Sequence, residues 1–225
     1  MTPPLAQLQN QLIISCQAPV NSPLHQPAMI AAMAQAACNQ GAAAIRVDTP
    51  AHVRAVKAVL PHIPIIGLWK QTLPGSSVYI TPRWQEAEAI IEAGAEIIAI
   101  DATDRPRPDG QDLAALIDQI HRRDRLVMAD IDTVANGIAA AQLGADLVGT
   151  TLYGYTEETQ GLAPPGYDLL RQLRQQISVH LICEGGIASP SMVAQAFELG
   201  ADAVVVGTAI TGIDLQVQAF KQSCP

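Results

Sequence analysis

The sequence of 225 residues contains no CxxC motif and no cluster of histidines. Its four cysteines, Cys16, Cys38, Cys183 and Cys224, are scattered, which argues against a zinc site or a redox-active pair. The five histidines also lack the spacing of metal ligands, so we expect neither a metal centre nor a histidine base. Reduced thiols in a cytosolic protein are our interpretation.

Positive charge is scarce too. The chain has 13 lysines and arginines against 21 aspartates and glutamates, which gives a formal net charge of -8. Nucleic-acid binding needs clustered basic side chains that displace counterions from phosphates, so this composition argues against a nucleic-acid partner. A small anion is still an acceptable ligand, because a local pocket can be positive on an acidic protein.

Apolar runs long enough to cross a membrane are missing as well. The first apolar run, residues 12–16, is far too short for that purpose. No basic segment precedes it as one does in a signal peptide. We therefore expect a cytoplasmic protein with no membrane partner.

What the sequence does have is a regular alternation of short aliphatic runs with segments of helical periodicity. The aliphatic runs are "LIISC", "AAIRV", "IPIIGLW", "EIIAI", "RLVMA", "DLVGT", "VHLIC" and "DAVVV". Continuously apolar strands are typical of a parallel sheet covered by helices. Eight such strand and helix units predict a single (β/α)8 TIM barrel formed by one domain, residues 1–225.

The helices are predicted at residues 27–40, 50–59, 83–93, 110–122, 133–143, 165–176, 190–199 and 213–221. A proline suits the first turn of four of them, at Pro27, Pro50, Pro165 and Pro190, because the missing N–H needs no partner there. Four Gly-Ala pairs, beginning at Gly41, Gly94, Gly144 and Gly200, come directly before strands. These glycines are predicted to end helices in the left-handed conformation.

Polar residues follow nearly every predicted strand, at the end where the catalytic loops of a barrel lie. They are Gln17, Arg46, Lys70, Asp101, Asp130, Thr150, Thr151 and Glu184. Leu68, Met128 and Ile182 stand two positions before Lys70, Asp130 and Glu184, and alternate strand residues share one face. The polar groups are therefore predicted to share the face of the barrel interior and to converge at one mouth.

Structural roles compete with function for several of these residues. Asp101 and Asp130 could cap loops or helices, which is the main role we expect for Asp101, and Arg46 could pair with one of them. Lys70 and Glu184 could form a structural salt bridge. We favour a catalytic role for these two, because lysine and glutamate rarely end apolar strands unless they are paired or functional.

The loops after the last two predicted strands, "EGGIASP" and "VGTAITG", are rich in glycine. Barrels often bind phosphate there through backbone N–H groups and a helix N-terminus. We expect Gly185, Gly186 and Gly207 to let the backbone approach an anion. Thr208 can add a hydroxyl donor.

Several longer motifs resemble one family. They include "LIISCQA", "IIGLWK", "VYITPR", "AIDATDRPRPDG", "MADIDT", "GADLVGTTLYGYT" and "CEGGI", and they extend over about the whole chain. On these motifs the chain is similar to the N-acetylmannosamine-6-phosphate 2-epimerase family. The resemblance implies reversible inversion at C2 of N-acetyl-D-mannosamine 6-phosphate without metal, nucleotide or organic cofactor.

The resemblance also implies which residues form the site. Gln17, Arg46, Lys70, Asp130 and Glu184 match the polar site residues of the family, and Thr151 and Tyr155 fall in the segment that lines the sugar. Two positions depart from the family pattern. Gly212 stands where an arginine commonly binds phosphate, which suggests weaker phosphate binding. Asp48 adds a carboxylate that could restrain Arg46 or cap the helix beginning at Pro50.

The mechanistic hypothesis makes Lys70 the principal acid/base and Glu184 its partner across the substrate. It places Lys70 in a buried position, oriented by Asp130, and uses Gln17 and Arg46 to hold substrate oxygens and stabilise an enolate. One base or two could serve the two faces of C2. A Schiff-base aldolase or lyase and a catalytically silent sugar-phosphate binder are the alternatives. We expect a homodimer.

Overall fold

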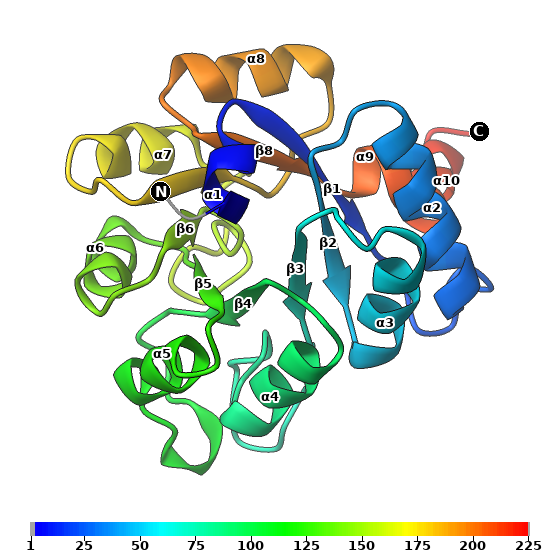
Figure 1. Cartoon of the computed structure of the whole chain (residues 1–225). Helices are drawn as coiled ribbons and strands as arrows, with labels where there is room; N and C mark the ends of the chain where they lie inside the picture. The colour runs from blue at the N-terminus through cyan, green and yellow to red at the C-terminus, as the bar shows by residue number, and fades with distance from the viewer. Residues whose placement is uncertain (1–2, 225) are drawn as a thin grey trace.

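The computed structural model describes residues 3–224 and forms a closed barrel of parallel strands, shown in Figure 1. Each strand pairs with the next along the chain, and the last pairs with the first. The strands are β1 (Gln11–Cys16), β2 (Ala44–Asp48), β3 (Ile65–Leu68), β4 (Ile97–Asp101), β5 (Leu126–Asp130), β6 (Leu147–Gly149), β7 (His180–Cys183) and β8 (Ala203–Val206). The prediction of a (β/α)8 barrel is confirmed.

Helices follow the strands and surround the barrel (Figure 1). They are α2 (Pro27–Asn39), α3 (Pro50–Val59), α4 (Trp84–Glu92), α5 (Leu113–His121), α6 (Val134–Gln142), α7 (Tyr167–Arg174), α8 (Pro190–Glu198) and α10 (Ile213–Gln222). The sequence did not predict the short helices α1 (Pro3–Leu8) and α9 (Thr208–Thr211), or the 3-10 turn η1 (Pro108–Gly110).

Two predicted helix starts are wrong. Helix α5 begins at Leu113 rather than at residue 110, because the side chain of Asp112 accepts a hydrogen bond from Ala115 N and caps the helix there. Helix α7 begins at Tyr167 rather than at Pro165. Tyr167 N donates to the Pro165 carbonyl in a turn, so Pro165 lies before the helix and not in its first turn.

The apolar side chains form two layers. One fills the space between the strands and the outer helices, and the other fills the barrel interior. Leu68, Met128 and Ile182 belong to the inner layer, which confirms that their strand positions face inward. Leu8 of α1 is also fully buried in this layer. Since α1 leads directly into β1, Leu8 closes the amino-terminal end of the barrel, opposite the predicted mouth.

The four glycines predicted to end helices do so. Gly41, Gly94, Gly144 and Gly200 have φ angles of 95°, 106°, 101° and 98°. Left-handed backbone at these positions costs an alanine or larger residue free energy that glycine avoids. The chain can therefore turn sharply from each helix into the next strand.

The segment after β3 returns to the barrel as a hairpin. Lys70 pairs in an antiparallel bridge with Ile80, and Gln71 N donates to the Tyr79 carbonyl at 2.9 Å. Ile80 is buried in the inner apolar layer. We call residues 69–81 the mouth hairpin, because they lie over the carboxyl ends of the strands.

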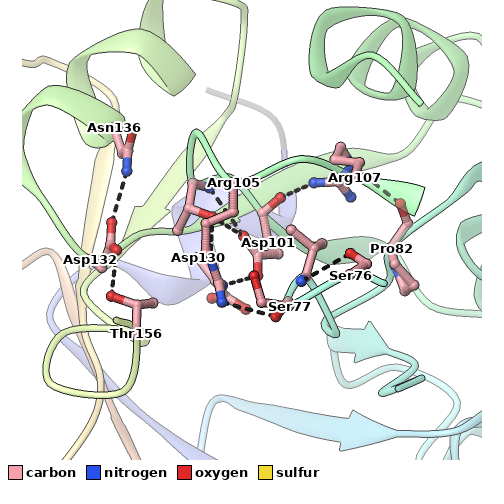
Figure 2. Close-up of polar contacts among 12 residues, drawn as sticks. Ser76, Ser77, Pro82, Asp101, Arg105, Arg107, Asp130, Asp132, Asn136 and Thr156 are labelled. Carbon is pink, nitrogen blue, oxygen red and sulfur yellow. Dashed lines mark hydrogen bonds and ion pairs between the residues drawn. The ribbon is translucent and has the colours of Figure 1, made fainter. Parts of the chain in front are cut away.

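Two arginines fasten the mouth hairpin to the loop after β4 (Figure 2). Arg105 pairs with buried Asp101 (Nη2 to Oδ2, 2.5 Å) and donates to the Ser77 carbonyl at 2.9 Å. Arg107 donates to the Thr81 and Pro82 carbonyls at 3.0 and 3.2 Å. The motif "DATDRPRPDG" thus has a structural function, as expected for its first aspartate.

A second polar cluster in Figure 2 joins the loops that follow β5 and β6. Asp132 accepts from the Asn136 amide at 2.8 Å and from the Thr156 hydroxyl at 2.7 Å. All three side chains are buried.

Among residues 3–224, no helix has the length and apolar character needed to cross a membrane.

Candidate active site

A cavity of about 1020 Å³ opens at the carboxyl ends of the strands. All but one of the predicted site residues line it: Gln17, Arg46, Lys70, Thr151, Tyr155, Glu184, Gly185, Gly186, Gly207 and Thr208. The exception is Asp130, which is fully buried beneath the cavity. Residues on or directly after β1, β2, β3, β6, β7 and β8 therefore contribute to one site, because the carboxyl ends of these strands meet at the same mouth.

Arg46 lies at the centre of the buried polar groups. Its Nη2 atom is 2.5 Å from Asp130 Oδ2, and its Nη1 atom donates to Asp130 Oδ1 at 3.2 Å. Its Nε atom lies 3.1 Å from Glu184 Oε1, without the alignment of a hydrogen bond. Burial lowers the pKa of Arg46, but Asp130 and Glu184 outweigh it, so the net shift is upward and the guanidinium stays charged.

Glu184 presents its carboxylate to the cavity from the end of β7. The Thr151 hydroxyl lies 2.6 Å from Asp130 Oδ1 and 3.2 Å from Glu184 Oε2, so it bridges the two acids. Burial raises the pKa of Glu184 from 4.5 to about 7, and Arg46 opposes this shift only in part. Both protonation states of Glu184 are therefore well populated near neutral pH.

Lys70 is exposed in the cavity, which corrects the expectation that it is buried. Its Nζ atom donates to Gln17 Oε1 at 2.6 Å, and its main-chain N–H donates to Asp48 Oδ1 at 3.0 Å. The expectation that Asp130 orients Lys70 is wrong. Asp130 lies deeper, where the guanidinium of Arg46 engages both of its oxygens.

Lys70 and Glu184 approach the cavity from opposite sides. Lys70 follows β3 and Glu184 follows β7, which are four strands apart in a closed ring of eight. Each has other partners, and no salt bridge joins the two within the described part of the chain. The structural salt bridge that we considered is therefore not formed, and both groups face the same space.

The glycine loops lie beside this pair. Gly185 and Gly186 have φ angles of 99° and 68°, and a Cβ atom on Gly186 would lie 2.7 Å from the main chain of Pro164. Gly207 precedes α9, whose first residue is Thr208. A Cβ on Gly212 would lie 2.8 Å from Thr208 Cα, so an arginine at that position requires the turn between α9 and α10 to shift.

Sequence reasoning missed Tyr79 and His25, and it noted Asp48 without assigning it to the site, although Asp48 also lines the cavity. Tyr79 of the mouth hairpin lines the cavity, and burial together with nearby carboxylates raises its pKa to about 12, so its phenol stays protonated. His25 also lines the cavity and lies 2.9 Å from the Ala18 carbonyl through Nδ1. Asp48 neither restrains Arg46 nor caps α3, since Thr49 is the cap. Only their positions in "VYITPR", "PLH" and "IRVD" could have suggested them.

Fold and site together define a class: a (β/α)8-barrel enzyme with acid–base groups on opposite sides of its mouth and glycine loops suited to an anion. Residues 30–224 match the family model described as "Putative N-acetylmannosamine-6-phosphate epimerase". The chain belongs to this family.

Individual relatives agree over nearly the full length. Proteins named "Putative N-acetylmannosamine-6-phosphate 2-epimerase" from Synechococcus elongatus and Thermosynechococcus vestitus are 63% and 57% identical to the chain. The matches cover 96% and 95% of this chain and 94% and 93% of the relatives. The solved structure of the N-acetylmannosamine-6-phosphate 2-epimerase from Clostridium perfringens superposes with a TM-score of 0.94 at 39% identity, covering 98% of this chain and 96% of that one.

Proposed function

We propose that this protein interconverts N-acetyl-D-mannosamine 6-phosphate and N-acetyl-D-glucosamine 6-phosphate by inverting C2, as an enzyme of amino-sugar and sialic-acid catabolism. The observation that carries the proposal is the placement of Lys70 and Glu184 on opposite sides of one cavity. Membership of the family supports the identity of the substrate.

Inversion requires the open-chain sugar, because the aldehyde at C1 makes the C2 proton acidic. A base removes this proton, and the electron pair of the C–H bond moves into an enolate with its charge on the C1 oxygen. A second group then donates a proton to C2 from the other face, and the carbonyl forms again. A proton acceptor at one face and a proton donor at the other both lower the barrier, and a well-placed group of this kind raises the rate by about 10²–10⁴-fold.

Glu184 suits one of these two roles. Its pKa of about 7 lets it take up a proton or give one away at neutral pH. Arg46 lies 3.1 Å from its Oε1 atom and stabilises the anion. Because Arg46 is also engaged by Asp130, we assign it to positioning Glu184 rather than to holding a substrate oxygen.

Lys70 suits the other role. Its amine contacts Gln17 and is otherwise presented to the cavity from the β3 side. Gln17 is therefore assigned to orienting Lys70, with its own amide bound to the Ser15 hydroxyl at 3.0 Å. We favour two groups acting on two faces, and the opposed positions of β3 and β7 in the ring of strands support this assignment.

The remaining lining residues are assigned to binding. Thr151 and Tyr155 line the cavity beside Gly185 and are assigned to the sugar. Backbone N–H groups of Gly185, Gly186 and Gly207, with the Thr208 hydroxyl, are assigned to the phosphate. These contacts would hold the charged end of the substrate beside Glu184, which directly precedes Gly185.

The test is proton NMR of N-acetylmannosamine 6-phosphate with the protein in D2O. We expect product carrying solvent deuterium at C2, and a loss of at least about 100-fold in kcat for Lys70→Ala and for Glu184→Gln. A matched control is Arg122→Gln on the exposed surface of the chain, which should be as active as the wild type.

Three results contradict the proposal. Unchanged turnover in both variants contradicts the assigned roles. A covalent adduct on Lys70 trapped by borohydride, without deuterium at C2, indicates a Schiff-base lyase or aldolase. Tight binding of the sugar phosphate without any exchange of the C2 proton indicates a silent binding protein.

We also propose that the protein works in the cytoplasm as a homodimer. Exposed apolar side chains on α10, including Val217 and Phe220 (75% exposed), support a contact with a second copy. Light scattering coupled to size exclusion measures the mass directly. Phe220→Asp should shift a dimer toward the monomer, and a monomeric wild type contradicts the proposal.

A further inference from the structure

Asp48 contacts Lys70, one of the two acid–base groups of the proposed mechanism. Its Oδ1 atom accepts the main-chain N–H of Lys70 at 3.0 Å. The two strands β2 and β3 pair in parallel up to Asp48 and Leu68, and Thr49 N donates to the Leu68 carbonyl at 2.9 Å. Because β3 ends at Leu68, the N–H of Lys70 lies beyond the ladder. The carboxylate of Asp48 supplies the acceptor that a longer strand would supply from its main chain.

The main chain of Lys70 is held from its other side by the mouth hairpin. The antiparallel bridge to Ile80 and the hydrogen bond from Gln71 N to the Tyr79 carbonyl fix that side. Beyond the main chain, only the 2.6 Å contact with Gln17 fixes the Lys70 amine among the described residues. Loss of the Asp48 contact therefore frees the β2 side of Lys70 while the hairpin stays attached.

Asp48 is itself held in place. Its main-chain carbonyl lies 3.1 Å from Nδ1 of His52, a buried side chain that packs edge-to-face on His25 with ring centres 4.6 Å apart. Burial raises the pKa of Asp48, and the charge of Lys70 opposes this shift. A short, half-buried side chain at the end of a packed strand is a rigid support for its neighbour.

We propose that Asp48 is a positioning residue that holds the main chain of Lys70 through its side-chain oxygen, so that the amine meets C2 of the substrate. The proposal rests on the proposed function. It assigns the effect to the acceptor atom and not to the negative charge. Misplacement of a catalytic group by about 1 Å can cost about 100-fold in rate, so a single lost hydrogen bond can be visible in kcat.

Two variants separate the acceptor from the charge. Asp48→Asn keeps an oxygen at the same position, and we expect its kcat to stay within about 3-fold of the wild type. Asp48→Ala removes the acceptor, and we expect kcat to fall by about 10-fold or more with KM within about 2-fold. Asp48→Leu, close in shape and without an acceptor, replaces the alanine variant if that variant does not fold. Asp118→Ala, which removes an exposed carboxylate on α5, is the matched control.

Hydrogen exchange at the Lys70 amide gives a readout that does not depend on turnover. We expect fast exchange in Asp48→Ala and protection in the wild type and in Asp48→Asn. A wild type that exchanges no C2 proton contradicts the proposed function, while the amide readout still tests the contact. An active wild type with unchanged kcat in Asp48→Ala contradicts the positioning role alone. Equal losses in Asp48→Asn and Asp48→Ala contradict it too, because the charge is then the required feature.

Discussion

The guanidinium of Arg46 and the carboxylate of Asp130 form a two-point ion pair at the bottom of the cavity. Only 1% of the surface of Arg46 is exposed, and none of that of Asp130. Removing two charges from water costs several kcal/mol, which their attraction offsets only when further contacts satisfy them. Thr151 and Glu184 supply those contacts. The pair therefore sets the depth and direction of the Glu184 carboxylate, which reaches the cavity.

Breaking this pair should be costly. In Asp130→Ala, Arg46 keeps only Glu184 as a charged partner, and we expect the free energy of unfolding to fall by about 3–5 kcal/mol. Urea denaturation measures this loss. The double variant Arg46→Met with Asp130→Leu should lose less free energy of unfolding than the sum of the losses in Arg46→Met alone and Asp130→Leu alone. Strict additivity contradicts the coupling that we infer.

Glu184 should make stability depend on pH in a defined direction. Its pKa is about 7 in the folded protein and 4.5 in the unfolded chain, so the folded state holds the extra proton between these values. The stabilisation by this proton is complete below pH 4.5 and is lost as pH rises through 7. The wild type should therefore lose stability relative to Glu184→Gln between pH 5 and pH 8, on the order of 2 kcal/mol.

Paired urea titrations of both proteins at pH 5 and pH 8 check this expectation. The quantity to compare is the difference in free energy of unfolding between the two proteins at each pH. The contributions of other groups that titrate in this range cancel in that difference. A wild type that gains stability relative to Glu184→Gln over this range contradicts the raised pKa of Glu184.

Arg105 and Arg107 hold the mouth hairpin through its main-chain carbonyls, and we call these contacts the clamp. The clamp should affect activity, because Lys70 belongs to the hairpin. Arg105→Gln removes the partner of buried Asp101 and the hydrogen bond to the Ser77 carbonyl. We expect the free energy of unfolding to fall by about 3 kcal/mol, faster amide exchange in residues 76–80, and a larger drop in kcat than rise in KM. Hydrogen exchange read by mass spectrometry, together with kinetics, measures all three.

An exposed ion pair is the control for the clamp. Arg122→Gln breaks a contact with Asp118 in which both side chains are well exposed, and such pairs contribute about 0.5 kcal/mol or less. Amide exchange in residues 76–80 that is no faster in Arg105→Gln than in this control contradicts the clamp.

The sequence predicts the ring of strands and the inward direction of Lys70, Asp130 and Glu184, because both follow from local patterns. Alternation by two fixes the face of Leu68 before Lys70 as firmly as it fixes any strand residue. Local patterns do not predict which of the converging polar groups pair with one another. Arg46 reaches Asp130 because of side-chain length and depth along two separate strands, and neither is visible in a pattern.

The mouth hairpin escaped prediction for a related reason. Residues 71–82 have no apolar alternation of their own, and the loop is shaped by contacts with Arg105 and Arg107, more than twenty positions further on. The helix α1 is equally hidden, since only the buried position of Leu8 in the barrel interior explains why a short amino-terminal segment is ordered. The structures of the mouth hairpin and of α1 both depend on contacts with segments that are distant in the sequence.

The glycine loop after β7 can be tested by adding one carbon atom. A Cβ on Gly186 would lie 2.7 Å from the main chain of Pro164 at a φ of 68°, whereas one on Gly161 would meet nothing within 4 Å at a φ of 87°. Gly161→Ala should cost only the left-handed backbone, about 1–2 kcal/mol, and Gly186→Ala should cost about 1–3 kcal/mol more. Because Gly186 is assigned to the phosphate and Gly161 lies outside the cavity, KM should rise in Gly186→Ala alone. Urea denaturation and initial rates test both parts, and an equal KM in the two variants contradicts the assignment of this loop to the phosphate.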